Sequence, residues 1–349
     1  MTSTEVAPGT ANAGSAYVMN KNLGFLAMII SATGMGMVGF FARGAIAGLS
    51  PEIKQYMGGV LAFGRMATGL IGFIVILLVT KRWAAFRASR LSFAVIMGGV
   101  CIGTSLSLYI TSTLLTSIAN AVFLIYTGPL FCTLLARIFR KEKISLSNGI
   151  FLVLVFVGML FTIEVLKFSG GSFQFGFDSS ASTPEFPSKA LGDLLGLLSG
   201  VFYGLALFFY GYRTDMNSDI RGTWNFLWAA VATGVITIML RPQVSALTPT
   251  NWTWASGLFL FAGLIALGFL VIAGRNLPAV EMSCISYWEC VVALLFGTFF
   301  FKEAMTFAAA IGGLLIIAGG VGPIIVEFFV KRRALPKAEE HWQEGEPIR

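Results

Sequence analysis

Ten long apolar segments divide this 349-residue chain, and they constrain its fold more than any other feature. Each is about 19–23 residues long, which is enough for an α-helix to cross about 30 Å of hydrocarbon at about 1.5 Å per residue. They lack the alternating pattern of membrane strands, so the sequence predicts an all-α integral membrane protein. The expected helices lie at 23–42, 57–79, 92–112, 117–137, 146–166, 191–212, 223–241, 253–274, 280–301 and 306–328.

Composition excludes several other classes of protein. Hydrophobic residues make up 56% of the chain and charged residues 12%, whereas soluble domains contain about 25% charged residues. The four cysteines lie inside apolar segments without metal-ligand spacing, and the single histidine, His341, lies in a polar tail. We therefore expect no metal and no cofactor. The absence of a phosphate-binding loop excludes an ATP-driven pump within this chain.

The net charge of +7 reflects membrane topology rather than nucleic-acid binding. If the N-terminus is cytoplasmic, 17 of the 24 basic residues fall in cytoplasmic loops and tails, 6 fall in outside loops, and Arg65 lies within a segment. Cytoplasmic loops of membrane proteins carry such an excess of Lys and Arg. The sequence thus predicts a multi-pass protein of the cell (inner) membrane with both termini in the cytoplasm.

Five regions follow from the segments. We expect a disordered cytoplasmic N-terminus at 1–22, a first five-helix unit at 23–166, an outside linker at 167–190, a second five-helix unit at 191–328 and a cytoplasmic tail at 329–349. The linker is rich in phenylalanine. It has two interpretations: a connection whose rings rest at the membrane interface, which we prefer, or a lid over an outward opening.

The two five-helix units resemble each other. At a constant offset of 161 residues, Tyr126 matches Tyr287, and Lys141-Glu142 matches Lys302-Glu303. Because each unit has an odd number of helices, two similar units in tandem insert with opposite orientations. Such inverted repeats are common in secondary transporters, where the substrate site lies near the midplane between the halves. We therefore expect two inverted five-helix repeats.

The order and spacing of several short motifs resemble the drug/metabolite transporter superfamily, specifically its EamA-type ten-helix exporters. The first unit carries Tyr109-Ile110-Thr111-Ser112, Gly128-Pro129 and Lys141-Glu142-Lys143, and the second carries Asn276-Leu277-Pro278-Ala279, Glu289 and Lys302-Glu303. One departure is that the family often has Glu-Pro where this chain has Glu289-Cys290. Without that proline, we expect the ninth helix to lack a kink.

Two ionisable residues well inside apolar segments are the leading site candidates, because a charge near the bilayer centre is costly. Glu289 lies between aromatic residues and a cysteine, so it could bind an ammonium group, carry a coupling proton or serve a structural role. Arg65 could bind a carboxylate as a bidentate fork or satisfy backbone carbonyls of a neighbouring helix.

Aromatic and polar residues complete the candidate substrate site. Tyr126 and Tyr287 are related by the repeat, so we expect them to face each other across a central cavity. The other candidates are Trp288, Tyr203, Trp228 and Asn120.

The sequence therefore predicts a secondary or facilitative transporter, not an enzyme, that moves a small amphipathic metabolite by alternating access. Amino acids or related compounds, exported, are the leading cargo, because a carboxylate and a guanidinium suit a zwitterion. Import, other metabolites, cofactors or cationic drugs are alternatives, and an integral membrane enzyme is a remote one. The expected partners are the small-molecule cargo and the lipid bilayer, with protons as a candidate coupling ion. The sequence leaves the oligomeric state open.

Overall fold

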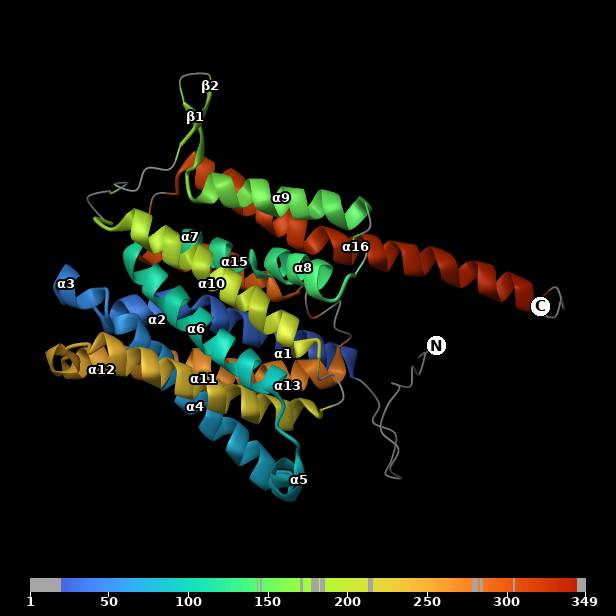
Figure 1. Cartoon of the computed structure of the whole chain (residues 1–349), viewed down its shortest axis with the longest axis horizontal. Helices are drawn as coiled ribbons and strands as arrows, with labels where there is room; N and C mark the ends of the chain where they lie inside the picture. The colour runs from blue at the N-terminus through green and yellow to red at the C-terminus, as the bar shows by residue number, and fades with distance from the viewer. Residues whose placement is uncertain are drawn as a thin grey trace.

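A computed structural model of the chain is a bundle of long helices (Figure 1). It describes residues 20–142, 144, 146–169, 172–176, 182, 186–212, 216–277, 282, 285–303 and 305–343. The expected disordered segment at 1–22 lies outside this description apart from its last three residues, as do residues 344–349 of the expected tail.

The first half of the chain forms nine helices and a hairpin within the described residues. These are α1 (Lys21–Gly36), α2 (Val38–Ala45), α3 (Pro51–Lys54), α4 (Met57–Val79), α5 (Trp83–Ala88), α6 (Phe93–Leu115), α7 (Ile118–Ile125), α8 (Gly128–Phe139), α9 (Leu146–Thr162), β1 (Leu166–Ser169) and β2 (Ser172–Phe175).

The second half is also helical. Its described elements are α10 (Lys189–Tyr210), α11 (Ser218–Leu240), the 3₁₀ turn η1 (Val244–Ala246), α12 (Pro249–Gly257), the π-helical η2 (Leu258–Ile265), α13 (Ala266–Asn276), α15 (Trp288–Phe300) and α16 (Phe307–Gln343).

Membrane-spanning length confirms the predicted class of protein. Among the described residues, seven helices or runs of joined helices are long and apolar enough to cross a bilayer. They are Lys21–Ala45, Met57–Val79, Phe93–Leu115, Ile118–Phe139, Lys189–Tyr210, Asp219–Leu240 and Pro249–Asn276. The other three expected segments contain shorter apolar helices, Gly149–Thr162, Trp288–Phe300 and Phe307–Pro323. The helical membrane fold is thus established, and ten crossings remain a prediction.

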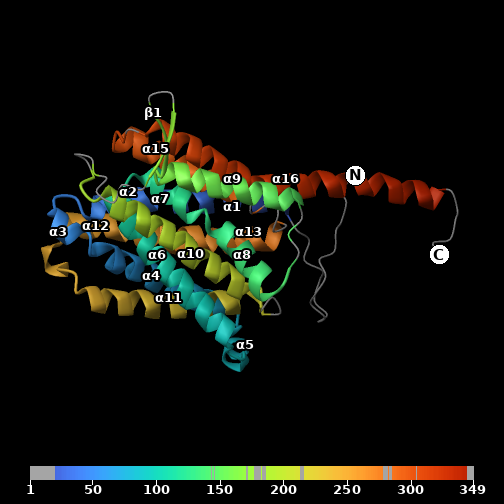
Figure 2. The same ribbon diagram turned by 45° about the horizontal axis from the view of Figure 1, so that its top comes forward.

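The expectation of an all-α chain needs one correction. After α9, strands β1 and β2 pair antiparallel, with Leu166 opposite Phe175. This hairpin projects from one end of the bundle in both views (Figures 1 and 2), which we call the hairpin end. Alternation of Phe with polar residues over 166–175 suits a two-residue-period strand, and the Gly170-Gly171 pair lies between the two strands.

Close helix packing brings the two halves together. Helix α6 packs against α10 and α11, α4 packs against α11, and α9 lies alongside α16 (Figure 2). Small residues allow this approach, since a methyl group at Gly204 would come 2.6 Å from the Gly128 carbonyl oxygen. The largest cluster of buried hydrophobic residues includes side chains from α2, α4, α6, α7, α12 and α15. Tyr109 and Tyr287, two of the residues described below, belong to this cluster.

Candidate functional site

Two interrupted helices place the repeat-related tyrosines at the centre of the bundle. Helix α7 ends at Ile125, and α8 begins at Gly128 after a turn at Tyr126 and Thr127. Helix α15 likewise begins directly after a turn at Tyr287. The two tyrosine rings lie 5.0 Å apart between centroids at an interplanar angle of 45°. They therefore contact each other inside the protein. Interrupted helices of this kind form the substrate sites of many transporters.

Glu289 lies in the first turn of α15, half-buried, where the helix dipole favours a negative charge. The Tyr126 hydroxyl lies 2.9 Å from Glu289 Oε2 and 2.9 Å from the backbone oxygen of Ser286. A phenol carries one proton, so it donates fully to only one of these acceptors at a time. An ionised Glu289 accepts a hydrogen bond from the Tyr126 hydroxyl. A protonated Glu289 can instead donate a hydrogen bond to the Tyr126 oxygen. The cluster can thus register the protonation state of Glu289.

The absence of a kink in the ninth helix stays a prediction, but the expected segment 280–301 is interrupted by a turn at Tyr287. Cys290 replaces the proline, and its amide donates to Tyr287 O at 3.0 Å, three residues back. The Tyr126 hydroxyl lies 2.9 Å from the Ser286 backbone oxygen, next to this turn. A side chain that inserts into the backbone ladder can interrupt a helix as a proline does, and Tyr126 from the first half lies at this interruption.

Arg65 comes from α4 and is only 2% exposed. Its Nε donates to the Ala262 carbonyl at 3.1 Å, and its Nη2 lies 2.7 Å from the sulfur of Met35. Its Nη1 is buried and has no hydrogen-bond partner among the described residues. Arg65 and Glu289 are close enough to interact electrostatically. No ion pair within 4.0 Å joins them in the described part of the chain, however, so a gap separates the two charges.

Tyr109 is a central residue that was not among the predicted site residues. It projects from α6, is 1% exposed, and its hydroxyl has no partner among the described side chains and backbone. It lies within electrostatic range of both Arg65 and Glu289. The available signal was its place in the Tyr109-Ile110-Thr111-Ser112 motif, which marks the resemblance but does not say which face of the helix the ring occupies.

The remaining aromatic candidates occupy different surroundings. Tyr203 lies beside the start of α8, where a methyl group on Gly128 would come 2.5 Å from its ring, and it is within electrostatic range of Glu289. Trp228 packs on Gly99 of α6, and its indole nitrogen is buried without a partner among the described residues. Trp288 is 39% exposed and donates to the Thr33 hydroxyl at 3.0 Å, so it projects away from the Tyr126–Tyr287 pair.

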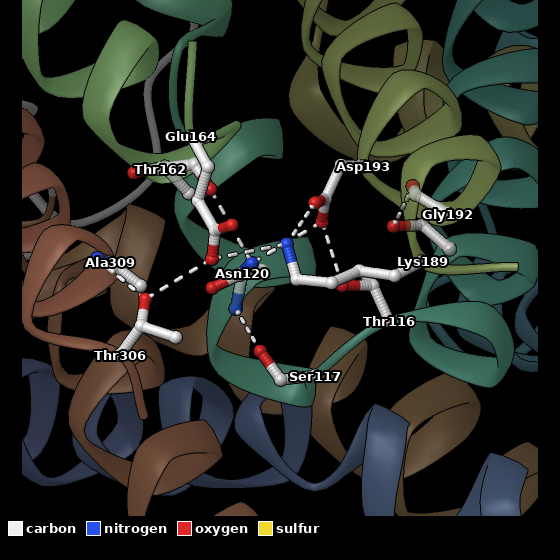
Figure 3. A network of polar contacts seen from close by, with 11 residues as sticks. Thr116, Ser117, Asn120, Thr162, Glu164, Lys189, Gly192, Asp193, Thr306 and Ala309 are labelled. Atoms are coloured by element: carbon white, nitrogen blue, oxygen red, sulfur yellow. Dashed lines mark hydrogen bonds and ion pairs between the residues drawn. The ribbon is translucent and has the colours of Figure 1, made fainter. Parts of the chain in front are cut away.

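Asn120 belongs to a separate polar network at the hairpin end (Figure 3). Its side-chain amide lies 3.3 Å from Asp193 Oδ1 and 3.4 Å from the Thr162 carbonyl oxygen. The Lys189 ammonium bridges Asp193 at 2.7 Å and Glu164 at 3.4 Å. Asn120 therefore helps to hold this end of the bundle together and does not contact Tyr126 or Glu289.

This network joins both halves of the chain. The Thr116 hydroxyl donates to Asp193 Oδ1 at 2.7 Å, and the Thr306 hydroxyl donates to Glu164 Oε1 at 3.3 Å (Figure 3). Lys189 and Asp193 sit one turn apart in the first part of α10, and both are buried. The buried charges thus have opposite partners and hydrogen bonds, as burial requires.

A second ion pair lies at the same end. Arg43 of α2 pairs with Glu303, which follows α15. Arg43 also donates to the carbonyl oxygens of Thr113 at 2.8 Å and Thr116 at 2.6 Å, which satisfies the last turn of α6. Glu303 accepts from the Ile118 amide at 2.9 Å, which caps α7. Charge counting placed Arg43 in an outside loop and gave no sign that it is buried.

The fold and these contacts define a helical membrane protein with buried charges between its helices. The profile of the EamA-like transporter family matches residues 22–163 and again residues 190–322. These matches cover more than half of the chain, so it belongs to the EamA-like transporter family.

Individual relatives are more distant. The chain is 24% identical over 238 residues to solute carrier family 35 member G1 of Homo sapiens, covering 67% of this chain and 62% of that protein. It is 26% identical over 202 residues to the uncharacterized transporter YoaV of Bacillus subtilis, covering 56% and 63%. The matches thus span a little under two thirds of the length of each relative. A solved structure titled "Crystal structure of protein" is 18% identical, with a TM-score of 0.55 over 90% of this chain and 99% of that chain, which supports the fold.

Proposed function

We propose that this transporter moves small amphipathic metabolites, with amino acids or related compounds as the leading class and export as the leading direction. The observation that carries the proposal is the central pair of unlike charges, Glu289 from the second half and Arg65 from the first. They are close but not bonded to each other. A zwitterion between them would pair with both, and the rings of Tyr126, Tyr287 and Tyr203 suit an apolar or aromatic side chain.

Alternating access is the mechanism that this arrangement favours. At the hairpin end, the Arg43–Glu303 and Lys189–Asp193 pairs are buried and link elements from both halves. Glu142, which the repeat relates to Glu303, forms instead a local, exposed pair with Arg140 at 2.7 Å. We infer that this conformation is closed at the hairpin end, and that these buried ion pairs separate when the path opens there.

The inverted repeat forms part of the same proposal. Two successive matches to one family profile, over 22–163 and 190–322, support two homologous units. The interruptions at Tyr126 and Tyr287 stand at equivalent repeat positions. We propose units at 23–166 and 191–328, joined by a linker at 167–190. Within it, Phe186 is half-buried with its ring centroid 4.9 Å from the Arg43 guanidinium carbon, which supports a linker packed on the bundle.

Protons are the coupling ion that the site could use. Glu289 is the candidate carrier, because its protonation changes which partner the Tyr126 hydroxyl bonds and so the contact with the Ser286 carbonyl at the helix interruption. Such a link would connect proton binding to the geometry of α15.

Counterflow uptake into proteoliposomes tests the proposed function. The purified protein is loaded with one unlabelled solute and given the same solute labelled outside, across amino acids, amines, nucleosides and organic acids. We expect accumulation of amino acids or close relatives above protein-free liposomes. Accumulation confined to nucleosides, or to amines alone, would contradict the leading cargo class.

The proposed orientation makes a separate prediction. With both termini in the cytoplasm of the cell (inner) membrane, a fluorescent protein fused after Arg349 should fluoresce, and alkaline phosphatase fused at the same point should be inactive in a bacterial host. The excess of basic residues in the presumed cytoplasmic loops is the physical reason. The reverse pattern of reporter activity would show that the topology is inverted.

A further inference from the structure

We propose that Tyr109 and Arg65 together form an anion subsite that binds the carboxylate of the cargo. This inference rests on the proposed function, because it assigns a cargo group to one side of the same central site. Tyr109 would then be a specificity-determining residue that favours solutes with a carboxylate over simple amines.

Two buried donors without acceptors carry the inference. Arg65 and Tyr109 are 2% and 1% exposed, and both Arg65 Nη1 and the Tyr109 hydroxyl lack partners within the described part of the chain. Buried polar groups in proteins are nearly always hydrogen-bonded, and each exception calls for an explanation. Two such exceptions within electrostatic range of each other indicate that an acceptor completes this place when it is occupied.

The guanidinium is oriented before any ligand arrives. Its Nε is held by the Ala262 carbonyl at 3.1 Å and its Nη2 contacts the Met35 sulfur at 2.7 Å, which leaves Nη1 for a ligand. These contacts come from η2 and α1, so neighbours on two sides fix the plane of the group. A preoriented donor loses less conformational freedom on binding.

The charges select the class of ligand. Arg65 supplies one positive charge, Tyr109 supplies a neutral donor, and Glu289 lies within electrostatic range as the acidic group. A carboxylate matches the two donors, and an ammonium group on the same solute matches Glu289. A zwitterion keeps the whole site neutral inside hydrocarbon, whereas a dianionic phosphate would leave a net charge that is costly there.

Tyr109→Phe tests the subsite, because it removes only the hydroxyl. Three probes share a phenyl-ethyl body: L-phenylalanine, phenethylamine, which lacks the carboxylate, and 3-phenylpropionate, which lacks the ammonium group. Their affinities are measured by competition in counterflow. We expect Tyr109→Phe to weaken L-phenylalanine and 3-phenylpropionate by about 10- to 100-fold, the range for a lost hydrogen bond to a charged group. Phenethylamine should be unchanged.

The melting temperature without cargo separates binding from structure. If the hydroxyl is unpartnered in the empty protein, Tyr109→Phe should melt at the same temperature or higher, since it removes an unsatisfied buried group. Tyr210→Phe is the matched control. The Tyr210 hydroxyl donates to Asn225 Oδ1 at 2.7 Å, so its loss should lower the melting temperature without changing the preference among the probes.

Two results would overturn the subsite: Tyr109→Phe melting as low as Tyr210→Phe, or unchanged L-phenylalanine affinity in a protein whose wild type transports it. If the wild type transports none of the three probes and no other amino acid in the counterflow screen, the leading cargo class of the proposed function is wrong. The melting comparison then decides the subsite alone: an undiminished melting temperature in Tyr109→Phe supports it and a lowered one refutes it.

Discussion

Glu289→Gln is expected to raise the apparent KM for a cargo with an ammonium group by roughly two to four decades. The substitution keeps the side chain's shape and leaves an amide oxygen for the Tyr126 hydroxyl, which lies 2.9 Å from the carboxylate. The effect therefore reports the lost charge. Removing one partner of a buried ion pair typically costs about 3–5 kcal/mol, which corresponds to this range. Counterflow at varied external concentrations measures it.

The same variant distinguishes three roles for Glu289. If Glu289 carries protons, uptake driven by a pH gradient is lost while counterflow continues, because exchange needs no net proton movement. If it is structural, the protein melts early. Glu142→Gln is the control, since Glu142 forms an exposed pair with Arg140 and its loss of charge should leave KM unchanged. Normal affinity, pH dependence and stability in Glu289→Gln would contradict both functional roles.

Glu303→Gln is expected to lower the free energy of unfolding by about 3–5 kcal/mol, because it leaves the Arg43 charge buried without its partner. It also weakens the contact with the Ile118 amide at the start of α7. Arg43→Gln should have a similar effect, and the double variant should be less destabilised than the sum of the two single variants. Denaturant or thermal unfolding in detergent measures all four proteins.

The exposed pair Arg140–Glu142 provides the control for this cycle. Its side chains are 38% and 49% exposed, and surface ion pairs contribute about 0–1 kcal/mol. The corresponding single variants should therefore melt close to the wild type. Additive effects of Arg43→Gln and Glu303→Gln would show that the two charges do not depend on each other, and the closed hairpin end would lose its main support.

The positions of the long helices could be predicted from the sequence because they depend on the length and hydrophobicity of each segment. Helix α4 occupies the predicted segment 57–79, and α6 extends the predicted 92–112 only to Leu115. The β1–β2 hairpin was not predicted because each strand has only four residues, which lie at the end of the expected fifth helix and in the expected linker. Short strands leave little periodicity to detect.

The site was predicted less completely, for a physical reason. The repeat led us to expect Tyr126 and Tyr287 to face each other across a central cavity; their rings lie 5.0 Å apart between centroids, and the cavity stays a prediction. The contact of the Tyr126 hydroxyl with the Ser286 carbonyl, beside the turn that precedes α15, joins residues 160 positions apart, and no local pattern encodes it. Likewise, Arg43 looked like a loop charge because its carboxylate partner, Glu303, lies 260 residues away in the chain.

The most direct test of the account compares two variants and two solutes in counterflow. L-Phenylalanine and phenethylamine are measured with wild type, Glu289→Gln and Arg65→Gln. If one central site holds the cargo between charges from both halves, L-phenylalanine loses affinity in both variants and phenethylamine loses it only in Glu289→Gln. Unchanged affinity for both solutes in both variants would contradict the claim that the cargo passes between Arg65 and Glu289.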